Sequence, residues 1–328
     1  YDLFDASEKP QLGYGRYPDV LTSLQFERML SASGPFAGEV MRLSNKKLPG
    51  KVAFIQCVGS RETEADFCSA VCCMYATKEA LILKEHHPDI DVAIFFIDIR
   101  AYGKGFESYY ERAVKAGVRY IRCQPSSLKQ IPLTNDIVIR YQDEQGQLKE
   151  ENFELVNLSC GLRPSKSGQA LAEKFDVRLT SEGFCVTDGL DPVTTTKEGI
   201  YAVGVFTGPK DIPETVIQAG AAASKVLALL ADTKGELLTE RIYPEERTQG
   251  AGELRTGVFV CHCGKNISSV VNIPEVVDYA DTLPNVAYVS DTLFACATDA
   301  GEKIKQAIIE HDLNRVVIAA CTPRTHEG

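Results

Sequence analysis

Unbroken apolar runs alternate with helix-like segments in the first half of the sequence. Residues 51–57, 91–98 and 118–123 are short apolar runs, and segments with helical periodicity at 69–86 and 106–116 separate them. Strands of this kind, alternating with helices, are typical of a parallel sheet that is covered on both faces. We therefore predict a Rossmann-type α/β unit over residues 51–160, preceded by a loop-rich segment with one short helix at 23–31.

The polar and apolar pattern changes after residue 130. Residues 137–142 and 152–159 alternate more regularly around a polar stretch, which predicts a β-hairpin. A strand at 199–204 and a long alanine-rich helix at 212–231 are expected next, followed by a polar linker at 233–255. From residue 256 a second, smaller α/β domain is expected, with strands at 256–261, 286–290 and 315–320 and helices at 273–282 and 300–311.

Composition narrows the class of protein. The 328 residues are 44% hydrophobic and 24% charged, which is ordinary for a soluble protein of two or three domains. No apolar run approaches the roughly 18 residues of a membrane-spanning helix, so we expect a cytoplasmic protein. The net charge of −10, without a basic cluster, argues against nucleic-acid binding. Because the sequence begins with Tyr1, we also expect it to be a segment of a longer protein.

Eleven cysteines are the strongest chemical signal in the composition. The number is odd and no secretory signal is present, so a disulfide framework explains them poorly. Cys123, Cys160 and Cys185 stand singly in or beside apolar runs, and we expect them to be small buried side chains. The other eight fall into two groups of four, for which metal or cluster binding is the better explanation.

The first group has the pattern C-x10-C-x3-C-C and consists of Cys57, Cys68, Cys72 and Cys73. Cys57 ends a predicted strand and the other three surround the start of the next helix, so one turn gathers four thiols near a helix N-terminus. The partial positive charge there stabilises thiolates. We favour a [4Fe–4S] cluster over zinc, because adjacent cysteines reach separate corners of a cube more easily than one ion. A redox-active disulfide remains open.

The same turn lies where a Rossmann fold binds the pyrophosphate of a dinucleotide. It contains a single glycine, Gly59, together with the acidic residues Glu62, Glu64 and Asp66. A dinucleotide site needs a glycine-rich turn and no repulsive charge. We therefore predict that this unit does not bind NAD(P)H and that its nucleotide position holds a metal cluster instead.

The second group consists of Cys261, Cys263, Cys296 and Cys321. Three loops that follow parallel strands carry these residues, and such loops converge on one crevice. We favour a second [4Fe–4S] cluster here, with a redox or apolar thiol group and zinc as alternatives. His262 and His326 are weaker candidate ligands, since exposed loop histidines are common.

The segment from Thr194 through the following helix resembles the carboxyl-terminal flavin motif of two-dinucleotide-domain flavoproteins. That resemblance implies contacts to FAD from the end of a strand and from the N-terminus of a helix. Gly204-Val205 departs from the usual Gly-Asp pair, and an ordinary strand–loop–helix core is the alternative. The expected FAD-binding residues are Gly204, Val205, Pro209, Lys210, Asp211, Ile212, Thr215 and Gln218. Lys78, little more than one helical turn after Cys73, is a hypothetical flavin-tuning residue; a solvent-facing lysine is the alternative.

Many segments together resemble the HdrA family of heterodisulfide reductase iron–sulfur flavoproteins. They include Gly13-Tyr-Gly-Arg-Tyr-Pro18, Val52-Ala-Phe-Ile-Gln-Cys-Val-Gly-Ser-Arg61, Val71-Cys-Cys-Met-Tyr75 and Gly208-Pro-Lys-Asp-Ile-Pro213. The resemblance implies that residues 1–232 are part of a thioredoxin-reductase-like domain with FAD and a [4Fe–4S] cluster held by the first cysteine group. Residues 256–328 resemble the family's amino-terminal domain, which departs from its usual order.

The resemblance implies an electron-transfer flavoprotein that works with other redox subunits of a soluble complex. We also expect a homodimer within that complex, and the sequence leaves electron bifurcation open. Two alternatives belong to other classes. An NAD(P)H-dependent disulfide reductase would need a C-x2-C pair and a glycine-rich nucleotide turn, both of which are missing. A non-catalytic, zinc-stabilised assembly scaffold would contain zinc without sulfide.

Overall fold

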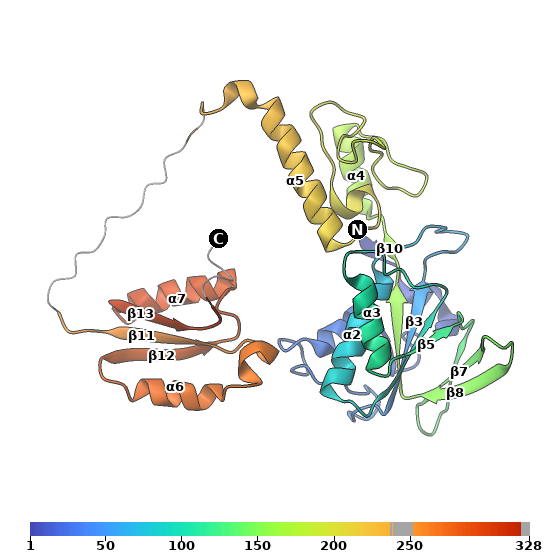
Figure 1. Cartoon of the computed structure of the whole chain (residues 1–328), viewed down its shortest axis with the longest axis horizontal. Coiled ribbons are helices and arrows are strands. Elements are labelled where there is room, and N and C mark those ends of the chain that lie inside the picture. Colours follow the sequence, from blue (N-terminus) through green and yellow to red (C-terminus); the bar gives the residue numbers. More distant parts are fainter. Residues whose placement is uncertain (237, 239–251, 323–328) are drawn as a thin grey trace. The chain divides into compact units, whose positions relative to one another are not determined.

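The computed structural model describes residues 1–236, 238 and 252–322, and the chain divides into two compact units, Tyr1–Leu238 and Thr239–Gly328 (Figure 1). Each unit contains its own parallel sheet. Most of the expected linker, residues 237 and 239–251, lies outside the described residues. Among the described helices, none is both long and apolar enough to cross a membrane.

Unit 1 is built around a five-stranded parallel sheet with the order β2-β9-β3-β4-β5. Its strands are β2 (Val20–Thr22), β3 (Lys51–Val58), β4 (Asp91–Phe96), β5 (Arg119–Arg122) and β9 (Leu155–Cys160). Helix α2 (Cys72–His86) connects β3 to β4, and helix α3 (Phe106–Lys115) connects β4 to the edge strand β5. The predicted parallel α/β unit is confirmed, including the apolar runs that form its strands.

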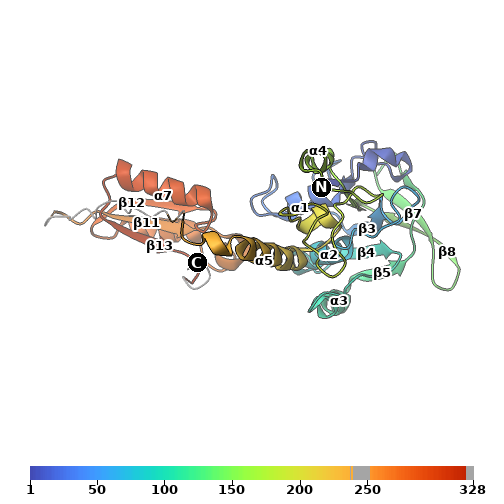
Figure 2. The ribbon, with the colours of Figure 1, turned by 90° about the horizontal axis from the view of Figure 1, so that it is seen from above.

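The two faces of this sheet have different covers. On one face, α2, α3 and α1 (Ser23–Leu30) pack against the strands around Phe26, Phe54 and Leu83, all fully buried. On the other face lies an antiparallel sheet of β6 (Leu128–Gln130), β7 (Ile137–Gln142) and β8 (Leu148–Phe153). Figure 2 shows the layer of β3, β4 and β5 between these covers. Burial on both faces explains why the central strands are almost wholly apolar.

The hairpin prediction was right for its first strand and wrong for its second. Strand β7 pairs with β8, whereas the next segment, β9, joins the central parallel sheet between β2 and β3. The break falls at Glu154, whose carboxylate accepts the Gly50 N–H at 3.2 Å. Every residue of β9 is buried, which is characteristic of a central strand rather than of a hairpin arm.

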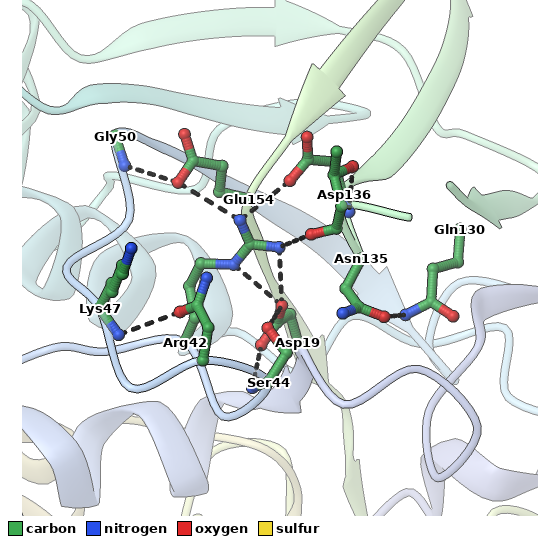
Figure 3. Close-up of polar contacts among 11 residues, drawn as sticks. Asp19, Arg42, Ser44, Lys47, Gly50, Gln130, Asn135, Asp136 and Glu154 are labelled. Carbon is green, nitrogen blue, oxygen red and sulfur yellow. Dashed lines mark hydrogen bonds and ion pairs between the residues drawn. The ribbon is translucent and has the colours of Figure 1, made fainter. Parts of the chain in front are cut away.

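A buried arginine fixes the loop-rich amino-terminal segment to the sheet (Figure 3). The Arg42 guanidinium forms ion pairs with Asp19 and Asp136 at 2.9 Å each and with Glu154 at 3.5 Å. It also donates to the Thr134 carbonyl at 2.8 Å. Asp19 is fully buried, so its charge is compensated inside the protein. A segment without much regular structure is held in place by these paired charges.

The remainder of unit 1 follows a short antiparallel pair, β1 (Asp2–Leu3) with β10 (Leu162–Arg163). Helix α4 (Lys166–Phe175) packs on a small core with Val177, Cys185 and Ala202. The expected strand at 199–204 is wrong: only an isolated bridge from Thr194 to Tyr201 forms, and a 3-10 helix begins at Gly204. A strand needs a neighbouring ladder, and none pairs with this segment in the part of the chain that the structure describes.

Helix α5 (Ile212–Leu229) confirms the long alanine-rich helix. All eighteen of its residues are described and none is buried, although the helix is strongly apolar. Ile212 is 80% exposed and Leu227 is 72% exposed. A helix that is apolar around most of its circumference normally lies inside a protein.

Unit 2 contains the sheet β12-β11-β13, which is parallel throughout. Its strands are β11 (Thr256–Cys261), β12 (Val286–Thr292) and β13 (Arg315–Ala319), as predicted within a few residues. Helix α6 (Ile273–Asp281) packs on Val258 and Val260, and helix α7 (Thr298–Glu310) packs on Phe259. Because neighbouring residues of β11 point to opposite faces, the two helices cover opposite sides of the sheet. The expected second α/β domain is therefore present.

Candidate functional site

The strand order of unit 1 reverses between β3 and β9. From β3 the chain proceeds to β4 and β5 on one side, and β9 is added later on the other side. In open α/β sheets such a reversal leaves a crevice at the carboxyl ends of the two strands, and ligands bind there. Cys57 lies near the end of β3 and Cys160 ends β9. The first cysteine group thus occupies the usual ligand position of this fold.

The turn from β3 to α2 has an unusual backbone. Cys57, Arg61 and Ala70 have left-handed φ angles of 58°, 60° and 62°, a conformation that L-residues other than glycine rarely adopt. The pairing of β3 with β9 is also irregular between Ile55 and Val58. Local strain of this kind persists only where surrounding contacts impose it, and it is concentrated at functional sites.

Two buried serines impose that conformation. The Ser60 hydroxyl donates to the Phe67 carbonyl at 2.8 Å, and the Ser69 hydroxyl accepts the Leu162 N–H at 2.8 Å. Ser60 is 2% exposed and Ser69 is 1% exposed. The Ser60 bond closes the turn on itself, and the Ser69 bond fastens its end to β10 (Leu162–Arg163). These serines were not recognised in the sequence, because single hydroxyl residues in a turn carry no distinctive pattern.

The four thiols of the first group are free and mostly buried. Cys57, Cys72 and Cys73 are 7%, 6% and 6% exposed, while Cys68 is half-buried. Burial, and then the neighbouring Cys73 and Cys68, raise the pKa of Cys57 to about 11. Burial likewise raises the pKa of Cys72 to about 12. The other thiols of the group contribute to the raised pKa values of Cys57 and Cys72, since like charges disfavour the thiolate.

The start of α2 suits sulfur ligands. Val71 caps the helix without a side-chain hydrogen bond, and its first turn contains no acidic residue. The Ala70 N–H donates to the Cys68 sulfur at 3.3 Å. Uncapped N–H groups and the helix dipole stabilise thiolates and a negatively charged cluster. The donor set and its surroundings fit a cluster with four cysteine ligands.

No group of three or more His, Cys, Asp or Glu side chains in the described ranges is arranged tightly enough for a single metal ion. Ligands of one zinc ion must all lie about 2.3 Å from the same point when they are sulfurs. A cube takes each sulfur at a different iron, so its ligands stand further apart. The identity of the ligands in both groups stays a prediction.

The second group is more open. Cys261 is 3% exposed and accepts the Ala295 N–H at 3.4 Å, Cys263 is half-buried, and Cys296 and Cys321 are exposed. Partial burial, and then Cys261, Cys296 and Cys321, raise the pKa of Cys263. Cys263 therefore interacts electrostatically with the other three thiols of the group.

The strand order in unit 2 explains this gathering. β11 is central, with β12 on one side and β13 on the other, so the order reverses beside β11 as it does beside β3. The His262 side chain pairs with Asp291, with 3.0 Å between Nδ1 and Oδ2. His326, the other candidate histidine, lies outside the described residues.

The expected flavin-side residues form one connected loop and helix start. The Lys210 ammonium donates to the carbonyls of Gly204 and Gly208, both at 2.9 Å, and the Gly204 N–H donates to Gln218 at 2.8 Å. Asp211 caps α5 with its carboxylate, and the Thr215 hydroxyl donates to the Asp211 carbonyl. The remaining members, Val205, Pro209 and Ile212, belong to the same loop and first turn.

Tyr102 follows Arg100 in the loop after β4, and burial raises its pKa. The charges of Glu214 and Asp211 at the start of α5, and of the Cys68 thiol, raise that pKa further. Whether the loop before α5 and the first cysteine group form one site stays a prediction.

Lys78 lies on α2 and forms an ion pair with Glu27 of α1. Its side chain is 38% exposed, so it is neither a fully solvated lysine nor a buried one. The assignment of Lys78 to flavin tuning stays a prediction.

A buried carboxyl group next to Lys78 on α2 was missed. Glu79 is 1% exposed and accepts a hydrogen bond from Asn157 of β9 at 2.7 Å. Burial, and then the Glu27 carboxylate, raise the pKa of Glu79 well above its ordinary value. Isolated polar residues inside apolar runs, Gln56 and Asn157 among them, were the available signal.

The fold and the first cysteine group define an α/β protein of the dinucleotide-binding type whose ligand position carries four thiols. No family model matches the sequence. The chain is 40% identical over 270 residues to a CoB--CoM heterodisulfide reductase iron-sulfur subunit of Methanopyrus kandleri, covering 80% of this chain and 41% of that protein. It is 42% identical over 248 residues to the corresponding protein of Methanocaldococcus jannaschii, covering 74% of this chain and 37% of that protein.

The chain belongs to the HdrA family of heterodisulfide reductase subunits, and it spans about two fifths of the length of these relatives. Among solved structures, thioredoxin reductase of Lactococcus lactis is similar to 56% of this chain and 53% of that one, with 21% identity and a TM-score of 0.38. LpdA of Mycobacterium tuberculosis is similar to 60% of this chain and 39% of that one, with 15% identity and a TM-score of 0.38.

Proposed function

We propose that this chain is part of an electron-transfer flavoprotein in which the first cysteine group holds a [4Fe–4S] cluster beside FAD. One observation carries the proposal: four free thiols, three of them buried, belong to the strand-to-helix connection at the ligand crevice of a parallel sheet. The relatives are named as iron-sulfur subunits, which agrees with that chemistry. A bound cluster would supply one-electron transfer, and the chain's own residues would hold it and exclude water.

The exposed surface of α5 supports a flavin site that further polypeptide completes. An apolar helix of 18 residues without a buried side chain requires a cover. The relatives are more than twice as long as the matched segment, so such a cover is available in proteins of this family. Lys210 and the start of α5 would then lie toward the flavin.

The second cysteine group would hold a second [4Fe–4S] cluster. Its support is weaker, because two of its four thiols are exposed. Relatives are components of larger reductases, one of them named as part of an H(2):CoB-CoM heterodisulfide,ferredoxin reductase in Methanothermobacter thermautotrophicus. We extend this to the present protein as one component of a cytoplasmic redox complex, present there as a homodimer, with electron bifurcation as one candidate activity.

Anaerobic purification followed by iron, sulfide and zinc analysis tests the proposal. We expect about eight iron atoms and about eight sulfides per chain, four for each cluster. About four of each would retain the first cluster and reject the second. Zinc without inorganic sulfide would contradict the proposal and favour a structural scaffold. Visible absorption of flavin and of iron–sulfur clusters differs, so the spectrum reports FAD separately.

A further inference from the structure

Two arginines and one aspartate lie directly beside the first cysteine group. Arg61 is in the turn between Cys57 and Cys68, and its Nη1 lies 2.6 Å from Asp98 Oδ1. Arg100 approaches the same carboxylate, with 3.1 Å between Nε and Oδ1. The Cys73 thiol donates to the backbone carbonyl of Asp98 at 3.6 Å. This charged group therefore touches the thiol site through Asp98.

The position of Arg61 is imposed by the turn. Its backbone is left-handed, and its N–H donates to the Phe67 carbonyl at 3.1 Å. Its side chain is 24% exposed, compared with 45% for Arg100. The constrained backbone and the short ion pair hold the charge of Arg61 at one position. An arginine on the open surface is not held in this way, because fixing its long side chain would cost conformational entropy.

The net charge of this group is positive. Two guanidinium groups flank one carboxylate, and Arg61 acts on Cys57 and Cys68 while Arg100 acts on Cys73. Reduction of a cluster adds one negative charge to the site. A fixed positive charge stabilises that added charge, and partial burial strengthens the interaction relative to water.

We propose that Arg61, held by Asp98, raises the reduction potential of the cluster at Cys57, Cys68, Cys72 and Cys73. The inference rests on the proposed function, because it requires that cluster. It assigns to Arg61 an electrostatic tuning role that decides how readily the cluster accepts an electron. Arg61 is distinct from Lys78, whose hypothetical role concerns the flavin.

Anaerobic redox titration of the chain tests this role. Arg61→Gln removes the charge, Arg61→Lys retains it, and Arg112→Gln on the exposed surface of α3 is the matched control. All variants also carry Cys296→Ser, so that the first cluster gives the signal. Dithionite is the reductant, electron paramagnetic resonance measures the reduced cluster, and iron and sulfide are determined for every sample.

We expect Arg61→Gln to lower the reduction equilibrium constant roughly tenfold, a shift of about 59 mV to more negative potential for one electron. The potential of Arg61→Lys should stay close to that of the protein with Cys296→Ser alone, and the potential of Arg112→Gln should not shift. An unchanged potential in a loaded Arg61→Gln protein would overturn the inference. So would equal shifts in both Arg61 variants, or loss of iron from Arg61→Gln alone, which would indicate an assembly role. Absence of iron and sulfide from the unsubstituted protein would instead reject the proposed function.

Discussion

The two cysteine groups occupy equivalent places in their sheets but are assembled differently. In unit 1, a single strand-to-helix turn contributes all four thiols, and three of them are buried. In unit 2, three separate loops contribute the thiols, and Cys296 and Cys321 are exposed. A site from one turn is fixed in part by local hydrogen bonds, such as that from Ser60 to Phe67. A site from three loops depends on the relative positions of strands that are distant in sequence.

The two cysteine groups should differ most in the rate at which their thiols react. In cluster-free protein that remains folded, Cys72 should react with iodoacetamide on the order of a thousandfold more slowly than an ordinary cysteine. The reason is that burial raises its pKa to about 12 from an ordinary 9, and the thiolate is the reactive form. Cys296 and Cys321 should be labelled first. Mass spectrometry of digested samples measures the order, and early labelling of Cys72 would contradict the structure.

The stability of unit 1 against unfolding should depend strongly on Arg42, which contacts none of the thiols. Arg42→Ala should lower the free energy of unfolding of unit 1 by about 3–5 kcal/mol, because the buried Asp19 carboxylate would lose the opposite charge beside it and keep only the hydrogen bonds from Ser44. Urea unfolding measures the change.

Arg140→Ala is the control for that experiment, since Arg140 is 67% exposed and pairs with Glu150 at the surface. An exposed pair of this kind contributes at most about 1 kcal/mol. Equal losses in the two variants would show that the Arg42 contacts do not hold the amino-terminal segment.

Single cysteine substitutions in the two groups should lower the iron content by similar amounts but the thermal stability by different amounts. Cys72→Ser and Cys296→Ser should each remove roughly half of the iron and sulfide, since each cluster needs four ligands. Thermal unfolding should be affected more by Cys72→Ser, because Cys72 is 6% exposed and packs inside unit 1. Equal iron content in Cys296→Ser and the unsubstituted protein would exclude Cys296 as a ligand.

The smallest expected effect concerns how the free energy of unfolding of unit 1 changes at acidic pH. Burial favours the neutral form of Glu151, but hydrogen bonds from Lys51, Tyr141 and Arg119 outweigh it and lower its pKa to about 2 from an ordinary 4.5. A lowered pKa means that Glu151 contributes stability above pH 4.5, and this contribution is lost as the pH falls toward 2.

Glu151→Gln should therefore weaken the dependence of unfolding free energy on pH between 4.5 and 2. Glu150→Gln, on the exposed side of the same strand, is the control. Denaturant unfolding at a series of pH values measures both variants. An identical pH dependence in the two variants would show that Glu151 is not held by its three partners.

Much of the fold could be predicted from local patterns. The apolar runs that form β3, β4, β11 and β13, and the helices between them, were placed within a few residues. The cysteine turn at Cys57–Cys73 was also recognisable, because ligand spacing within one turn is a property of the sequence itself. The hairpin and the strand at 199–204 were misassigned, since both depended on which neighbour a strand pairs with.

The sequence by itself determined the alternation of strands and helices over residues 51–123 and 256–320, and the placing of eight cysteines in turns at strand ends. The tertiary structure decided the pairing of β9 beside β3, the burial of three thiols and the position of Arg61 against Asp98. Periodicity reports only which residues avoid water along one element. Strand pairing, charge compensation and thiol pKa values arise between elements that are distant in the sequence, so they require the folded arrangement.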